Sequence, residues 1–232
     1  MEDMIQVAGV IDADEAEMLV ACGVTHLGFP FRLPVHREDL SERAAAEIIA
    51  ALPASVHGVL ITYLDTAAEI ASLAGELGVS WVQLHGSVEV AELERLRAER
   101  PALTIIKSLI VRAGNAAGMN TEVARYEPWV DAFITDTFDP ETGASGATGK
   151  VHDWDVDRRI VARSRRPVIA AGGLRPSNVG DVIRAVRPAG VDVHTGVEGP
   201  DGRKRRELVE AFVAEARRGF ASIGGGAAAA RG

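Results

Sequence analysis

The chain has 232 residues, with 25 Lys plus Arg against 33 Asp plus Glu and a formal net charge of −8. This acidity argues against a nucleic-acid partner, because phosphate backbones are bound by basic surfaces. The single cysteine, Cys22, excludes a disulfide framework and a cysteine-rich metal site. An acidic N-terminus and the lack of a long apolar run predict a cytoplasmic protein with no membrane partner.

Short apolar runs alternate with amphipathic stretches, a pattern typical of a parallel sheet wound by helices. The expected strands are Met4–Gly9, His26–Phe29, His57–Thr62, Trp81–Leu84, Thr104–Leu109, Ala132–Asp136, Pro167–Ala171 and Val191–Thr195. The expected helices are Asp14–Cys22, Ser41–Leu52, Ala67–Gly78, Val88–Glu99, Ala113–Tyr126, Asp155–Arg163, Asn178–Val186 and Arg205–Gly219. Asp14, Ser41 and Ser177 stand where N-caps are expected.

These β/α units predict a single (β/α)₈ TIM barrel, a fold that takes about 250 residues. The barrel is expected over residues 1–220, and the Gly- and Ala-rich residues 221–232 are expected to form a disordered tail. A doubly wound open sheet is the structural alternative.

Chemistry in such barrels lies at the C-terminal ends of the strands. Asp136 ends the sixth expected strand, and a carboxylate there is costly to desolvate without a partner or a purpose. It is therefore the first catalytic candidate, with helix capping or loop bracing as the alternative. His85 and His194 are bases, phosphate ligands or hydrogen-bonded turn residues. Lys107 is a substrate-binding cation, an amine nucleophile or the partner of a barrel carboxylate.

Glycines follow the last two expected strands. Gly172 and Gly173 come after the seventh strand, and Thr195 and Gly196 come after the eighth. Turns of this kind expose backbone N–H groups and form the usual phosphate cradle of a barrel. The alternative is a pair of tight turns that need glycine only for their backbone angles.

Several segments together resemble the phosphoribosylanthranilate isomerase family, from about Ile5 to Val213. The segments are Gly28-Phe29-Pro30-Phe31 with Arg37, Gln83-Leu84-His85-Gly86, Asp136-Thr137, Gly146–Trp154, Ala171–Val179, Gly190–Val193 and Gly196-Val197-Glu198. The resemblance implies an Amadori rearrangement in tryptophan biosynthesis, catalysed by an aldose–ketose isomerase that needs no cofactor and no metal. It implies Asp136 as the general acid, and Arg37, Lys107, Gly146 and the glycine turns as substrate-binding groups.

One position departs from the family pattern. The family's base is the cysteine of a Lys-Ile-Cys-Gly motif that ends the first strand, and here that motif reads Gln6-Val7-Ala8-Gly9. Alanine cannot accept a proton, so the base role passes to Asp12, His85, His194 or a bound water if the reaction is retained.

Three hypotheses follow for the function. The first is an isomerase of the family's own type. The second is a divergent phosphosugar isomerase or lyase of specialised metabolism, and the third is a non-catalytic phosphosugar-binding barrel. In each case the expected partner is a small phosphosugar, and the protein is expected to be a monomer or a homodimer.

Overall fold

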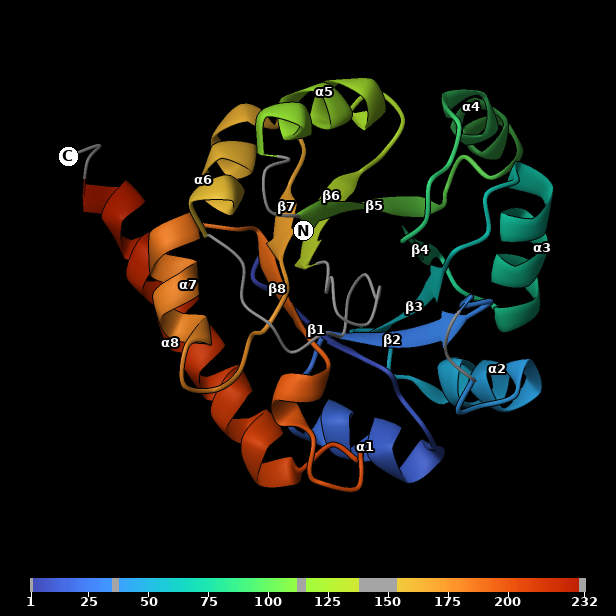
Figure 1. The fold of residues 1–232 in the computed structure, drawn as a ribbon. Helices are drawn as coiled ribbons and strands as arrows, with labels where there is room; N and C mark the ends of the chain where they lie inside the picture. Colours follow the sequence, from blue (N-terminus) through green and yellow to red (C-terminus); the bar gives the residue numbers. More distant parts are fainter. Residues whose placement is uncertain (1, 35–37, 112–115, 138–153, 230–232) are drawn as a thin grey trace.

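In the computed structural model, the described residues are 2–34, 38–111, 116–137 and 154–229. Parallel strands pair in chain order from first to last, and the last pairs with the first, so the sheet is a closed barrel (Figure 1). The strands are β1 (Met4–Ala8), β2 (His26–Phe31), β3 (His57–Thr62), β4 (Trp81–Leu84), β5 (Thr104–Val111), β6 (Ala132–Thr137), β7 (Val168–Ala170) and β8 (Gly190–Val193). The predicted (β/α)₈ barrel is confirmed, and the open sheet is wrong.

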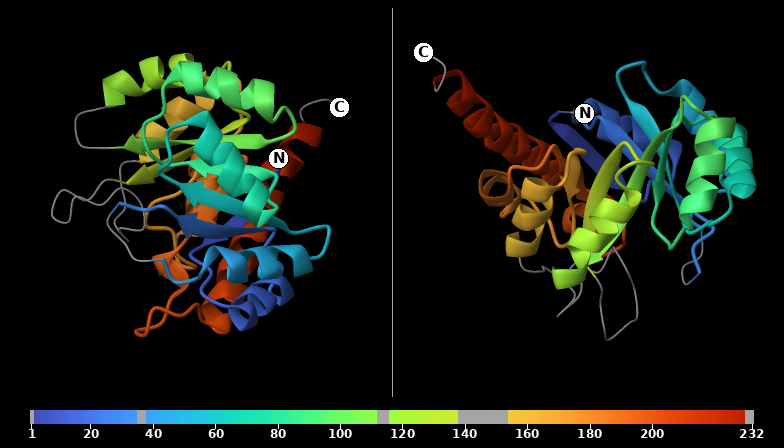
Figure 2. Two further views of the ribbon diagram at one scale, coloured as in Figure 1. Left: turned by 90° about the vertical axis from the view of Figure 1, so that its right-hand side faces the viewer. Right: turned by 90° about the horizontal axis from the view of Figure 1, so that it is seen from above.

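The helices lie outside the sheet and surround it (Figures 1 and 2). They are α1 (Ala13–Ala21), α2 (Glu42–Ala51), α3 (Ala67–Leu77), α4 (Val90–Glu99), α5 (Ala116–Tyr126), α6 (Trp154–Arg163), α7 (Val179–Val186) and α8 (Arg206–Ala229), with a short 3₁₀ helix η1 (Thr195–Val197) after β8. No helix within the described ranges is long and apolar enough to cross a bilayer.

Two of the expected N-caps are misplaced. Ser41 caps α2 as predicted, because its side chain accepts a hydrogen bond from the backbone N–H of Ala44. Helix α1 is capped by Asp12 instead of Asp14, and α7 begins after Asn178 instead of Ser177. The extended backbone of Asp12 lets its carboxylate accept the backbone N–H of Glu15, whereas Asp14 is already inside the helix.

Helix α8 is longer than the expected helix Arg205–Gly219. It continues to Ala229 and so enters the segment 221–232, whose disorder stays a prediction. Residues 230–232 lie outside the described part of the chain.

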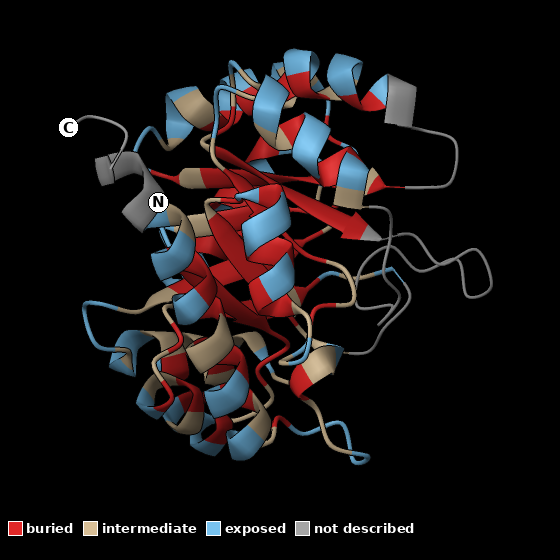
Figure 3. Ribbon diagram, turned by 90° about the vertical axis from the view of Figure 1, so that its left-hand side faces the viewer, coloured by how far each residue is buried: buried red, intermediate tan, exposed pale blue. Residues whose placement is uncertain are grey.

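Apolar side chains fill two compartments, one between the sheet and the helices and one inside the barrel. Most strand residues are buried, and the exposed residues of the helices lie on their outer faces (Figure 3). Successive side chains of a strand point to opposite sides of the sheet. In β5, Ile105 and Leu109 therefore join the compartment under the helices, whereas Ile106 joins the barrel interior.

Aromatic rings occupy the N-terminal end of the barrel interior. The rings of His26, His57 and Trp81 lie with centroids 4.7–5.2 Å apart. Burial and the neighbouring His57 lower the pKa of His26 to about 3, so the ring is neutral in the folded protein. Nε2 of His26 has no hydrogen-bond partner among the described residues.

This arrangement predicts an acid-sensitive fold. The folded pKa of His26 lies below its ordinary value of 6.5, so the unfolded chain binds the extra proton and stability falls as the pH drops below 6.5. We expect a loss of about 3 kcal/mol between pH 6.5 and pH 4 from this residue. Urea unfolding of the protein and of His26→Phe at both pH values measures it. An equal acid loss in both proteins would contradict the assignment.

Candidate functional site

The C-terminal end of the barrel gathers the side chains from which a site is built. Asp136, at the end of β6, is only 6% exposed, and His85 directly after β4 is equally buried. His194 directly follows β8. By strand alternation these positions share the inner side of the sheet with Ala8 of β1. The structure therefore brings three of the expected catalytic residues to one end of the barrel.

Asp136 and His85 belong to one buried polar group that includes Tyr63. The rings of Tyr63 and His85 lie 4.9 Å apart, and Nδ1 of His85 lies 3.1 Å from Oγ of Ser108. Burial and the nearby Asp136 charge raise the pKa of Tyr63 to about 12. The Tyr63 hydroxyl therefore stays protonated at neutral pH and remains a hydrogen-bond donor beside the Asp136 carboxyl group.

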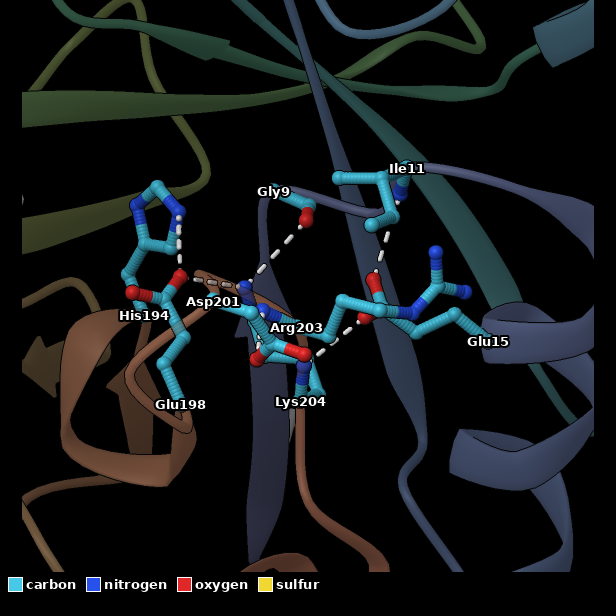
Figure 4. Close-up of polar contacts among 8 residues, drawn as sticks. All are labelled: Gly9, Ile11, Glu15, His194, Glu198, Asp201, Arg203 and Lys204. Carbon is cyan, nitrogen blue, oxygen red and sulfur yellow. Dashed lines mark hydrogen bonds and ion pairs between the residues drawn. The ribbon is translucent and has the colours of Figure 1, made fainter.

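His194 belongs to a second polar group, between β1 and β8 (Figure 4). Its Nε2 lies 3.2 Å from Oε1 of Glu198, and Nζ of Lys204 lies 2.7 Å from the same oxygen. Nζ of Lys204 also donates to the carbonyl oxygen of Gly9 at 3.2 Å. Burial opposes ionisation of Glu198, but hydrogen bonds from His194 and Lys204 outweigh it and lower its pKa to about 2.

The two glycine turns lie against each other. Gly172 and Gly173 have φ values of 94° and 65°, which an L side chain rarely adopts. A Cβ on Gly196 would lie 1.8 Å from the carbonyl oxygen of Leu174, so the two loops meet with no room for a side chain. Nδ2 of Asn178 donates to the carbonyl oxygen of Gly173 at 3.0 Å and braces the first turn.

Asp12 has a structural role at the start of α1. One carboxylate oxygen caps α1 by accepting the backbone N–H of Glu15 at 2.8 Å, and the other forms an ion pair with Arg203. Although burial alone would raise the pKa of Asp12, these two contacts lower it. An ionised carboxylate that is already hydrogen-bonded through both oxygens is a weak proton acceptor.

Lys107 is not brought to the site, contrary to the sequence-based expectation. Its Nζ donates to the carbonyl oxygens of Leu84 and Ser108 at 3.3 and 2.8 Å and lies 5.3 Å from the centre of the Tyr126 ring. Tyr126 belongs to α5, so the lysine points to the helix side of the sheet. Ser108, the next residue, takes the inner position and contacts His85.

A hydrogen-bonded trio lies deeper in the barrel. Nε2 of Gln6 lies 2.9 Å from both Oε1 of Gln83 and Oδ1 of Asp192. Burial raises the pKa of Asp192 to about 6, against the opposing effects of Gln6, His194 and Lys204. Gln6 stands where the family motif has a lysine, so Asp192 has an amide as its nearest partner in place of a cation.

Two expected binding residues, Arg37 and Gly146, lie outside the described residues. In the described part of the chain, no group of three or more His, Cys, Asp or Glu side chains could hold a metal ion. Sequence reasoning missed Tyr63, Asp192, Glu198 and Lys204 as members of these polar groups. Asp192 and Glu198 carried a signal, because they lie in the Gly190–Val193 and Gly-Val-Glu segments of the family resemblance.

Comparisons with known proteins show the family of the chain. Residues 5–215 match the family model described as N-(5'-phosphoribosyl)anthranilate (PRA) isomerase. The chain belongs to this isomerase family. It is 38% identical over 220 residues to N-(5'-phosphoribosyl)anthranilate isomerase 2 of Methanosarcina mazei, covering 94% of this chain and 96% of the relative. It is 36% identical over 216 residues to the isomerase of Haloferax volcanii, covering 92% of each chain.

Solved structures of the family have the same fold. The isomerase of Thermotoga maritima superposes with a TM-score of 0.79 at 29% identity, over 93% of this chain and 98% of that one. A thiamine phosphate pyrophosphorylase of Pyrococcus furiosus, at 16% identity, covers 94% of this chain and 96% of its own with a TM-score of 0.66. That second likeness shows the fold alone.

The position of Lys107 predicts that it does not bind substrate directly. We expect Lys107→Met to leave the affinity for a phosphosugar ligand within about threefold, which is less than 1 kcal/mol. Isothermal titration with inorganic phosphate and with a reduced product analogue measures this. A loss of affinity above tenfold in a variant with an unchanged melting temperature would contradict it.

The buried Asp192 predicts a substitution that stabilises the protein. Its folded pKa of about 6 lies above its ordinary value of 3.8, so stability falls as the pH rises through this window. Asn at this position keeps the hydrogen bond from Gln6 without the charge. We expect Asp192→Asn to raise the free energy of unfolding by about 3 kcal/mol at pH 7 and by almost nothing at pH 3.5. Equal effects at both pH values, measured by urea unfolding, would show that ionisation is not the cause.

Proposed function

We propose that this chain isomerises N-(5'-phosphoribosyl)anthranilate by an Amadori rearrangement, as an aldose–ketose isomerase of tryptophan biosynthesis. The family match over residues 5–215 carries this proposal. It is supported by a buried carboxyl group, Asp136, at the C-terminal end of a barrel strand, where barrel enzymes hold their catalytic groups.

The adjoining glycine turns support binding of the 5'-phosphate. Backbone N–H groups of tight turns bind anions, and Gly172, Gly173, Thr195 and Gly196 supply such turns after β7 and β8. A phosphoribosylanthranilate isomerase of the same fold was solved with reduced 1-(o-carboxyphenylamino)-1-deoxyribulose 5-phosphate, with a TM-score of 0.77 to this chain at 26% identity. We assign the turns after β7 and β8 of this chain to the phosphate of the substrate, with Arg37 and Gly146 as further binding residues.

The first chemical step is protonation of the ribose ring oxygen. Asp136 is the proposed acid, because it ends β6 on the inner side of the barrel and lies near enough to raise the pKa of Tyr63. Protonation breaks the bond between C1 and the ring oxygen and leaves an iminium ion between C1 and the anthranilate nitrogen. Loss of the C2 proton then gives the enolamine, which tautomerises to the ketone product.

The alternative functions are not favoured. Relatives that match over almost the whole chain are isomerases by name, which argues against a different phosphosugar reaction and against a non-catalytic barrel. The proposed partner is therefore a small phosphosugar. One solved structure of the family holds monomers generated from the dimeric isomerase of Thermotoga maritima. For this chain, a monomer or a homodimer stays a prediction.

Turnover of N-(5'-phosphoribosyl)anthranilate, followed through the loss of its fluorescence, tests the proposal. We expect Asp136→Asn to lower kcat by about 10²–10⁴-fold, because an acid acts on a charge that develops only in the transition state. Affinity for the reduced product analogue is expected to stay within about tenfold. A kcat unchanged in Asp136→Asn would remove this residue from the mechanism.

A further inference from the structure

The proposed reaction needs a second group that accepts the C2 proton, and β1 does not supply one. At the C-terminal end of β1, the residue that faces the barrel interior is Ala8, which has no titratable atom. Asp136 is used as the acid in the proposed function, so the described candidates for the base are Asp12 and the imidazoles of His85 and His194. The structure separates the two histidines by position and by partners.

Strand register places His194 beside Ala8. In the pairing of β1 with β8, Val7 lies opposite Val193, so the next positions along the two strands are Ala8 and His194. The imidazole covers the backbone of the following residue, Gly9, where a Cβ would lie 2.3 Å from Nε2. Gly9 also has a φ of 77°, so two independent constraints keep this position free of a side chain.

Glu198 and Lys204 hold the ring of His194 in place (Figure 4). The carboxylate lies 3.2 Å from Nε2, and the ammonium group of Lys204, whose side chain is fully buried, fixes that carboxylate from the other side at 2.7 Å. Nδ1 of His194 has no hydrogen-bond partner in the part of the chain that the structure describes. A carboxylate on one ring nitrogen orients an imidazole and stabilises the imidazolium that forms when the other nitrogen takes a proton.

The other two candidates for the base, His85 and Asp12, do not lie beside Ala8. The ring of His85 is buried, packs on Tyr63 and shares a hydrogen bond with Ser108 on the far side of the barrel from β1. Asp12 uses both carboxylate oxygens in the cap of α1 and the ion pair with Arg203. Neither residue is adjacent to Ala8 on the inner side of the sheet.

We propose that His194, oriented by Glu198, is the base that takes the C2 proton of the substrate, an inference that rests on the proposed function. After Asp136 gives its proton to the ring oxygen, Nδ1 of His194 takes the proton from C2. The electron pair of the broken C–H bond forms the double bond between C1 and C2 and neutralises the iminium nitrogen. His194 then returns its proton to water, and Asp136 takes one up, so the net reaction is an isomerisation.

The proposal implies a characteristic pH dependence. The charged groups that face His194 are Glu198 on the loop after β8, Lys204 before α8 and Asp192 below it on β8. A histidine base works only when its imidazole is neutral, so kcat must fall on the acid side of the profile. Removing the Glu198 carboxylate takes away the contact that orients the ring, so it must lower kcat without a matching change in KM.

The first experiment makes the same substitution, histidine to glutamine, at the C-terminal end of the barrel and at its N-terminal end. In His194→Gln the side-chain amide can still donate a hydrogen bond to Glu198 but cannot act as a base, so we expect kcat to fall at least 100-fold with product-analogue affinity within threefold. We expect a deuterium isotope effect with substrate labelled at C2, because proton removal becomes rate-limiting. His57→Gln, at the N-terminal end of the barrel, is the matched control and keeps kcat within threefold.

The second experiment restores a base. Imidazole added to His194→Ala is expected to recover kcat at least tenfold. The double variant Ala8→Cys/His194→Gln is expected to recover at least as much, and its kcat is expected to rise with pH as the thiol ionises. Glu198→Gln, the positioning variant, is expected to lower kcat at least tenfold with KM and product-analogue affinity unchanged, because the ring loses the carboxylate that orients it. Should His194→Gln not fold, His194→Ser, whose short hydroxyl side chain is not a base at neutral pH, replaces it.

The outcomes distinguish the two proposals. Turnover by the unmodified protein together with a kcat within threefold in His194→Gln, or an unchanged kcat in Glu198→Gln, would overturn the assignment of the base and leave the isomerase function intact. No turnover of N-(5'-phosphoribosyl)anthranilate by the unmodified protein would overturn both.

Discussion

Pairing of β1 with β8 closes the barrel, and the site depends on it. These strands lie at opposite ends of the chain, and they meet in a register that sets Met4 against Gly190 and Gln6 against Asp192. A Cβ on Gly190 would come within 2.6 Å of the Cβ of Met4, so the closure needs glycine at this point. The same register brings Ala8 and Gly9 of the first strand to His194 of the last one.

Alternation along each strand then decides which residues take part in chemistry. In β5 it turns Ser108 toward His85 and sends Lys107 to the aromatic ring of Tyr126 under the helices. Burial lowers the pKa of that lysine to about 8, and carbonyl oxygens at both sides accept its hydrogen bonds. A cation in the middle of a barrel strand is thus a structural group here, although its residue type suggests a ligand for phosphate.

Sequence reasoning predicted the architecture well because strand and helix periods are local properties of the chain. It placed Asp136, His85 and His194 at strand ends, which the fold brings to one end of the barrel. It could not assign Lys107 to a side of the sheet, because one residue of difference in the strand register reverses every side chain. It also missed that Asp12, and not Asp14, caps α1, so a residue occupied by the helix entered the list of possible bases.

The partners that surround His194 were harder to foresee. Lys204 and Glu198 come from different sides of a loop, and their ion pair is visible only once the chain has folded back on β1. Likewise, the pKa of Asp192 is raised because the residue is buried beside Gln6, and the residues next to Asp192 in the sequence do not indicate this. Composition and periodicity do not predict the contacts in the site between residues that are separated by most of the chain.

The neighbouring positions of Ala8 and His194 have a consequence for how such a site evolves. Two inner residues of adjacent strands, level in register, face the same region of the barrel, so a proton acceptor can pass from one strand to the other without any movement of the backbone. A chain with an acceptor at both positions would remain active after losing either one. Replacement of one base by another therefore requires no inactive ancestor, and it adds the overlying imidazole as a second constraint on Gly9, whose positive φ already favours glycine.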